Sequence, residues 1–115
     1  LTGGAVDESL GPLFFQPTVL ADVPDTAAIM SQENFGPVAP ITAFDTEEEV
    51  IQRANATEYG LVAYVHSLDP RRIYRLTRAR QFGMVAVNRT KVTGAPIPFG
   101  GVKQSGLGRE GARQG

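Results

Sequence analysis

The sequence predicts an α/β fold in which parallel strands and helices alternate in the order β-α-β-α-β, followed by a glycine-rich C-terminal loop or helix. Two segments of helical periodicity begin at N-cap residues and alternate with short apolar runs typical of strands. The connections between these runs are long enough to contain a helix, which favours parallel pairing. The 13 glycines and 8 prolines cluster around Gly36 and in the C-terminal tail, and glycine-rich loops at strand ends are where α/β proteins bind ligands.

The first 45 residues are expected to contain two strands. Residues 1–13 are glycine-rich and irregular, and residues 14–20 form a strand that Pro17 places at a sheet edge or a strand start. Residues 22–31 are mostly turn and helix-start residues. Residues 38–44 form the second strand, where the regular β-α pattern begins.

The first helix should begin at Thr46 and end near Asn55. Thr46 and Glu49 have the spacing of a capping box, in which each side chain bonds the other residue's backbone N–H. Three apolar residues of this helix are expected to face the core: Val50, Ile51 and Ala54. Residues 61–65 then form an apolar run typical of a strand that is covered on both faces.

The second helix is delimited at both ends. Asp69 is its N-cap and Pro70 occupies the first helical position, whereas Gly83 is expected to stop it. Its buried stripe consists of Ile73, Leu76 and Ala79. Residues 84–88 form the strand that follows.

Three features are interpreted as structural. Residues 106–111 match G-x-G-x-x-G, but the preceding residues are no strand and no acidic residue follows about 20 positions later, so backbone packing is favoured over phosphate binding. His66, the only histidine, has no neighbour at triad or metal-ligand spacing. The second helix carries an arginine face that we expect to be solvated or subunit-facing: Arg71, Arg72, Arg75, Arg78 and Arg80.

The composition argues against several classes of function. Eleven basic and twelve acidic residues leave a net charge of -1, so neither nucleic acid nor a membrane is an expected partner. No membrane span or targeting signal is visible, which predicts a cytoplasmic location. With no cysteine there is no disulfide, no thiolate metal site and no thiol nucleophile. The chain begins without methionine, so we expect it to be a piece of a longer polypeptide.

Residues 33–38 combine a carboxylate, Glu33, with an aromatic ring, Phe35, before a Gly-Pro turn that leads into a strand. A carboxylate can accept two hydrogen bonds from a vicinal diol, and an aromatic ring can stack on a flat heterocycle. On chemistry alone, ligand binding and a plain turn are equally good interpretations.

Four blocks occur in a fixed order: ENFGPV at 33–38, ANATEYGL at 54–61, GMVAVN at 83–88 and PFGGVKQSGLGREG at 98–111. In register, they resemble the C-terminal part of the catalytic domain of the aldehyde dehydrogenase superfamily. The resemblance covers nearly the whole of residues 1–115. It implies that these residues are a fragment of an α/β catalytic domain, and it is greatest to succinate-semialdehyde dehydrogenases.

The resemblance implies a cofactor, NAD or NADP. Glu33 is similar to the glutamate that holds the hydroxyls of the nicotinamide ribose, and Phe35 to the phenylalanine beside the nicotinamide ring. Both assignments agree with the diol and stacking chemistry of residues 33–38. The residues that read the adenosine ribose lie outside the chain, so NAD and NADP remain equal alternatives.

On the substrate side, the resemblance implies that Phe99 helps to wall the aldehyde pocket and that Thr93 contacts the substrate. Glu110 is similar to a glutamate with a proton-relay role, and Arg109 to its structural neighbour. The hydroxyl of Thr93 would bind a substrate carboxylate, although many members have serine there. Arg89-Thr90-Lys91 and Pro96 depart from the loop that the family predicts.

In this family a cysteine thiolate attacks the aldehyde and hydride passes to NAD(P). The cysteine, the general base and the oxyanion asparagine would precede Leu1, so the chain should be inactive alone and should need the N-terminal part of the same enzyme. The resemblance also implies a homo-oligomer. The expected substrate is succinic semialdehyde. The alternatives are a dehydrogenase for another small aldehyde and a non-catalytic, self-associating module.

Overall fold

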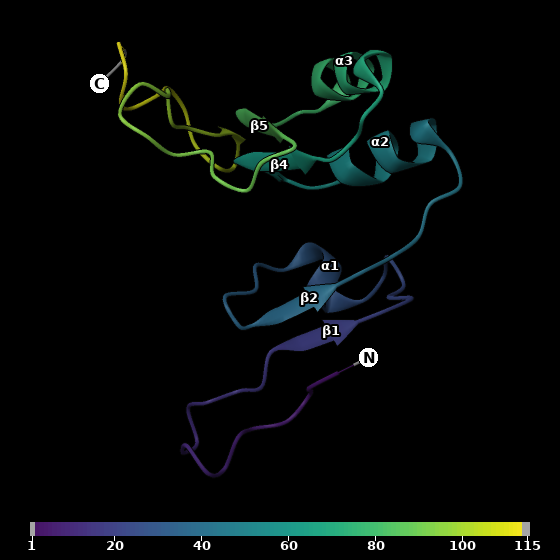
Figure 1. Cartoon of the computed structure of the whole chain (residues 1–115), viewed down its shortest axis with the longest axis vertical. Coiled ribbons are helices and arrows are strands. Elements are labelled where there is room, and N and C mark those ends of the chain that lie inside the picture. Colours follow the sequence, from purple (N-terminus) through teal and green to yellow (C-terminus); the bar gives the residue numbers. More distant parts are fainter. Residues whose placement is uncertain (1, 114–115) are drawn as a thin grey trace. The chain divides into compact units, whose positions relative to one another are not determined.

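The computed structural model describes residues 2–113. The chain divides into two compact units, Leu1–Asp45 and Thr46–Gly115. Strands pair in three two-stranded sheets, two of them parallel and one antiparallel (Figure 1). The α/β class with parallel strands is confirmed, while the hydrogen-bonded sheets are smaller than a continuous β-α-β-α-β unit would give.

The first unit contains β1 (Thr18–Leu20), α1 (Ala28–Ser31) and β2 (Val38–Pro40). β1 and β2 are parallel, with Thr18 opposite Val38. The backbone N–H of Ile41 donates to the carbonyl of Leu20 at 2.7 Å and continues the ladder beyond β2.

Both predicted strands of this unit were too long. Of residues 14–20, only the last three form β1, and Phe15 makes a single antiparallel bridge with Val6. Pro17 separates these two pairings, since proline has no N–H for a continuous ladder. β2 likewise ends at Pro40 and does not extend to residue 44.

The second unit contains α2 (Glu47–Asn55), β4 (Val62–Val65), α3 (Pro70–Ala79) and β5 (Met84–Val87). β4 and β5 are parallel, with Val62 opposite Met84, and α3 connects them in one βαβ unit. The buried apolar side chains of this unit come from these two strands and α3: Ala63, Val65, Leu76, Met84 and Ala86.

Both predicted helix starts are confirmed. The Thr46 hydroxyl accepts the N–H of Glu49 at 3.1 Å. The Asp69 carboxylate accepts the N–H groups of Arg71 and Arg72 at 2.8 and 3.3 Å. These bonds satisfy amides that a helix N-terminus leaves without intrahelical partners.

The predicted helix stop at Gly83 is wrong. α3 ends at Ala79, and Gly83 does not have the left-handed φ of a glycine cap. The Asn55 side chain instead joins the ends of the two helices, because its Nδ2 donates to the Ala79 carbonyl at 2.8 Å and its Oδ1 accepts the Gln81 N–H at 2.9 Å.

Two short strands were not predicted. β3 (Tyr59–Gly60) and β6 (Val102–Lys103) form an antiparallel pair that ties the tail to the residues before β4. The expectation that residues 61–65 are covered on both faces is wrong for the described chain, because Leu61 and Tyr64 are 37% and 45% exposed. In the tail as far as residue 113, the structure contains turns and no helix.

The arginine face is exposed at Arg71, Arg72, Arg75 and Arg78, whereas Arg80 is half-buried. Two of the exposed arginines also bond to α2. Arg75 donates to both carboxylate oxygens of Glu47, from Nε at 2.6 Å and from NH2 at 2.9 Å, and Arg72 donates at 3.2 Å. The hydrogen bonds from Arg75 are the main cause that lowers the pKa of the Glu47 carboxyl. No helix in residues 2–113 is long and apolar enough to cross a membrane.

Candidate functional site

The turn before β2 is organised by one side chain. Asn34 Oδ1 accepts the N–H of Gly36 at 3.0 Å, and Asn34 Nδ2 donates to the carbonyls of Gly36 and Val38 at 3.3 and 3.2 Å. An asparagine that bonds its own backbone in this way fixes a tight turn. Sequence reasoning missed this role, although an asparagine two residues before glycine is a known turn signal.

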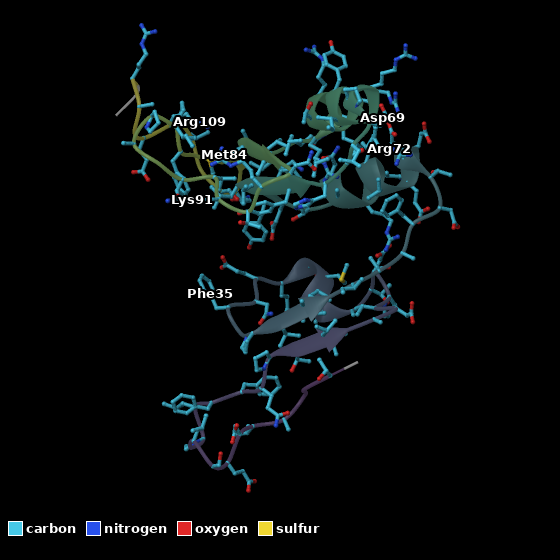
Figure 2. The ribbon with its side chains drawn as sticks, in the orientation of Figure 1. Phe35, Asp69, Arg72, Met84, Lys91 and Arg109 are labelled. Atoms are coloured by element: carbon cyan, nitrogen blue, oxygen red, sulfur yellow. The ribbon has the colours of Figure 1, made fainter. Side chains whose placement is uncertain are left out.

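The turn presents Phe35 to solvent. The Phe35 side chain is 93% exposed and extends away from the ribbon (Figure 2). A phenylalanine ring buries a large apolar area when it is covered, so an uncovered ring on a fixed turn is an unusual arrangement. Its face is accessible to a flat ligand.

Glu33 lies beside this ring in the sequence and is also exposed. Within residues 2–113, its carboxylate has no hydrogen-bond or ion-pair partner. Both carboxylate oxygens can therefore accept hydrogen bonds from a ligand such as a diol. The first unit thus places an acceptor and an aromatic ring on one turn.

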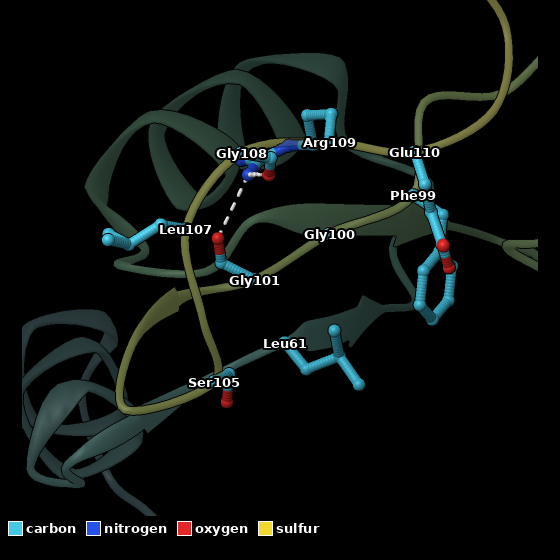
Figure 3. A pocket seen from close by; sticks show the side chains of 9 residues that line it. All are labelled: Leu61, Phe99, Gly100, Gly101, Ser105, Leu107, Gly108, Arg109 and Glu110. Atoms are coloured by element: carbon cyan, nitrogen blue, oxygen red, sulfur yellow. Dashed lines mark hydrogen bonds between the residues drawn. The ribbon is translucent and has the colours of Figure 1, made fainter. Parts of the chain in front are cut away.

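In the second unit, Phe99 and Glu110 are brought together by backbone pairing. The N–H of each donates to the carbonyl of the other at 2.8 Å, in an isolated antiparallel bridge. Side chains directly opposite in an antiparallel pair lie on the same side, and those of Phe99 and Glu110 extend in the same direction in Figure 3. Both line a hollow of about 370 Å³ whose other walls include Leu61 and Ser105.

Arg109 holds the tail in shape around this hollow. Its NH1 donates to the carbonyls of Gly101 and Gly108 at 2.9 and 2.6 Å, and its NH2 donates to the Gly83 carbonyl at 3.4 Å. Figure 3 shows the guanidinium reaching across to the Gly101 carbonyl. Because one planar group collects three carbonyls, the side chain fixes the backbone on both sides of the hollow.

Close backbone packing explains the glycine before β5, Gly83, and the first two glycines of the tail, Gly100 and Gly101. A Cβ atom at Gly83 would overlap the carbonyl oxygen of Gly100, and one at Gly101 would lie 2.5 Å from the Cβ of Ser105. Sequence reasoning favoured backbone packing for residues 106–111. A Cβ atom at Gly106 or Gly108 would meet nothing within 4 Å, so that prediction is wrong for these two glycines, and the close approaches lie earlier, at Gly83, Gly100 and Gly101.

Two polar side chains of the tail, which sequence reasoning missed, bond to the backbone between α2 and β4. The Ser105 hydroxyl accepts the N–H of Gly60 at 3.0 Å. Lys103 Nζ donates to the carbonyls of Asn55 and Thr57, each at 2.9 Å, at the C-terminal end of α2. A cation at this end of a helix bonds the last carbonyls favourably. No sequence signal identifies these contacts, because they join residues more than 40 positions apart.

Thr93 lies apart from the residues of the hollow. It is exposed in the loop after β5 and does not line the hollow beside Phe99. His66 is exposed as well. The described residues contain no group of three or more histidine, aspartate or glutamate side chains placed to hold a metal ion. The structure therefore brings Phe99 and Glu110 together on one wall and places Glu33 and Phe35 on one turn.

Comparison with known proteins identifies relatives along the whole chain. The model of the aldehyde dehydrogenase family matches residues 1–115. The chain is 56% identical over 115 residues to a succinate-semialdehyde dehydrogenase of Paenarthrobacter nicotinovorans, covering 100% of the chain and 25% of that protein. It is 56% identical over 111 residues to a non-phosphorylating aspartate-semialdehyde dehydrogenase of Halomonas elongata, covering 96% of the chain and 22% of that protein.

A third relative is the NADP(+)-dependent succinate-semialdehyde dehydrogenase of Saccharomyces cerevisiae, which is 49% identical over 115 residues, covering 100% of the chain and 23% of that protein.

 The chain thus spans about a quarter of the length of the curated relatives that it matches.

Solved structures agree with these relatives. The succinate-semialdehyde dehydrogenase of Burkholderia pseudomallei superposes with a TM-score of 0.95 at 46% identity, covering 100% of the chain and 24% of that structure. An aldehyde dehydrogenase of Mycobacterium tuberculosis complexed with NAD+ superposes with a TM-score of 0.87 at 37% identity, covering 98% of the chain and 23% of that structure. The relatives are NAD- or NADP-dependent oxidoreductases, and the chain belongs to the aldehyde dehydrogenase family.

Proposed function

We propose that the protein containing this chain oxidises an aldehyde to its carboxylic acid with NAD+ or NADP+, and that succinic semialdehyde is its substrate. The observation that carries the proposal is the turn at residues 33–37, on which the uncovered Phe35 ring is held by the hydrogen bonds of Asn34. The relatives support a semialdehyde substrate, because the two that are 56% identical are a succinate-semialdehyde and an aspartate-semialdehyde dehydrogenase.

The turn suits a nicotinamide nucleotide. Glu33 has two free acceptor oxygens for the two hydroxyls of a ribose, and Phe35 offers an open face beside them for a flat ring. When bound, the cofactor supplies the acceptor for the hydride that leaves the substrate carbon. The role of this chain is to orient the cofactor, because neither side chain takes part in bond formation.

On the substrate side, Phe99 provides an apolar wall, and the Glu110 carboxylate lies on the same wall with an exposed path to water. A carboxylate in this position can take up and release a proton without moving the backbone, which suits a relay. We propose the Thr93 hydroxyl as a contact for the substrate carboxylate. Its exposure leaves it free to donate a hydrogen bond.

The chain has no cysteine, so these 115 residues provide no thiolate nucleophile. We therefore propose that the chain alone is inactive and that its partner is the rest of the same enzyme, in a homo-oligomer. The exposed leucines support a need for further covering, since Leu68 and Leu107 are 98% and 99% exposed.

A self-associating module is the second candidate, and the same exposed leucines favour it. The two candidates differ in activity. A self-associating module would form oligomers in light scattering and would show no NAD(P)-dependent oxidation even in the full-length protein.

The cofactor assignment is tested by Glu33→Gln in the full-length enzyme, with Glu8→Gln as the matched control on another exposed carboxylate of the first unit. Loss of a charge-assisted hydrogen bond should raise the KM for NAD(P) about tenfold, while the control leaves it unchanged. An unchanged KM in Glu33→Gln would remove the ribose assignment.

A further inference from the structure

A second hollow, of about 100 Å³, lies along β5 and the loop that follows it. Its walls are apolar at Met84, Val92 and Ile97, and two basic residues, Arg89 and Lys91, stand at the same walls. Met84 and Lys91 are labelled in Figure 2. The hollow has space for a small acidic group together with the carbon atoms next to it.

The loop that carries these residues is fixed at both ends. At its start, Asn88 has a left-handed φ of 51°, and its side chain bonds Ser67 twice, accepting the N–H at 2.9 Å and donating to the carbonyl at 2.8 Å. At its end, Ala112 donates its N–H to the Ala95 carbonyl at 3.1 Å, and Phe99 pairs with Glu110. The basic residues and the Phe99 wall therefore belong to one anchored segment.

The positive charges of Arg89 and Lys91 have no acidic partner within the described chain. Neither forms an ion pair or a side-chain hydrogen bond with residues 2–113. Other basic groups of the same unit have partners within it, since Arg75 donates to Glu47 and Arg109 donates to backbone carbonyls. Two unpaired cations beside an apolar hollow favour an anion with a short hydrocarbon stem.

We propose that Arg89 and Lys91 recognise the acidic group at the far end of the aldehyde substrate, so that they determine specificity for semialdehydes of dicarboxylic acids. This inference rests on the proposed function. It assigns the charge recognition to two residues that depart from the loop expected for the family, and it is an alternative to the Thr93 contact, because Thr93 does not line this hollow.

The test uses the full-length enzyme and two aldehydes with four carbons, succinic semialdehyde and butanal, which differ in the carboxylate. In Lys91→Gln and Arg89→Gln, the ratio of kcat/KM for succinic semialdehyde to that for butanal should fall about tenfold each. Arg71→Gln removes an equivalent exposed charge from α3 and should leave the ratio unchanged. Lys91→Arg should retain the ratio, which excludes misfolding as the cause.

The outcomes are distinct. If the wild-type enzyme oxidises both aldehydes and the ratio is unchanged in Lys91→Gln and Arg89→Gln, this inference is overturned and the proposed function stands. The inference is also overturned if only Thr93→Val lowers the ratio. If the wild-type enzyme oxidises neither aldehyde with NAD(P)+, the proposed function fails and the inference falls with it.

Discussion

The turn at residues 33–37 and the tail at residues 98–111 are both glycine-containing loops with predicted site residues, but they are held in different ways. One side chain, Asn34, shapes the turn, and the Phe35 ring on it is left uncovered. The tail is held by a backbone bridge, by Arg109 and by close glycine contacts, and it lines its own hollow. The turn therefore offers side chains to a ligand, whereas the tail builds a wall.

The largest effect on stability is expected from disturbing the contact between Gly83 and the tail. Gly83→Ala places a methyl group against the Gly100 carbonyl oxygen, and neither backbone can move without disturbing the other. The substitution should cost about 3 kcal/mol of stability, measured by urea denaturation. Gly94→Ala is the matched control, because its Cβ would meet only ordinary contacts at 3.7 Å. Equal stability of the two variants would show that the tail is not tightly packed.

An intermediate effect is expected from loosening the turn. Asn34→Ala removes three hydrogen bonds that are all exposed. Their loss should destabilise the turn conformation by about 1 kcal/mol and raise the KM for NAD(P) about fivefold. Gln32→Ala, at an exposed position just before the turn, should leave the KM unchanged. If Asn34→Ala lowers global stability as much as Gly83→Ala does, the contrast between the two loops is wrong.

The smallest effect is expected at the ion pair between α2 and α3, outside both loops. The pKa of Glu47 is lowered in the folded chain, mainly by hydrogen bonds from Arg75. Its contribution to stability is therefore present above the unfolded pKa, near 4.5, and is lost as the pH falls through the lower folded pKa. The difference in unfolding free energy between wild type and Glu47→Gln should shrink between pH 6 and roughly pH 3.

Glu58→Gln, an exposed carboxylate outside the ion pair, provides the control for this titration. A difference between wild type and Glu47→Gln that stays constant over the same pH range would contradict the assigned cause of the shift.

Local chemistry made part of the fold predictable from sequence. The starts of α2 and α3 follow from Thr46 and Asp69, whose side chains bond amides two or three residues away. Strand ends were less predictable, because Pro17 interrupts the ladder before β1 and the apolar residues after Pro40 do not continue β2 as a strand. The pairing of β3 with β6 could not be predicted, since its partners are more than 40 residues apart.

The candidate site likewise contains residues that could be predicted from the sequence and contacts that could not. The chemistry of Glu33 and Phe35 was visible in the sequence because both residues belong to one turn. The pairing of Phe99 with Glu110 depends on the Arg109 contacts and on the backbone crossing at Gly83, which no local pattern reveals. The loop of Arg89 and Lys91 was noticed only as a departure from the family, and its hollow became visible in the fold.

The most direct test of the cofactor assignment measures the binding of NADH and of NADPH to the full-length enzyme by fluorescence titration, comparing Phe35→Ala with Phe14→Ala. Both rings are more than half exposed, at 93% and 54%, so the two variants lose similar side chains from the first unit. We expect Phe35→Ala to raise the Kd of the reduced cofactor that binds about tenfold through lost stacking, and Phe14→Ala to leave this Kd unchanged. An unchanged Kd in Phe35→Ala would contradict the assignment of this turn to the cofactor.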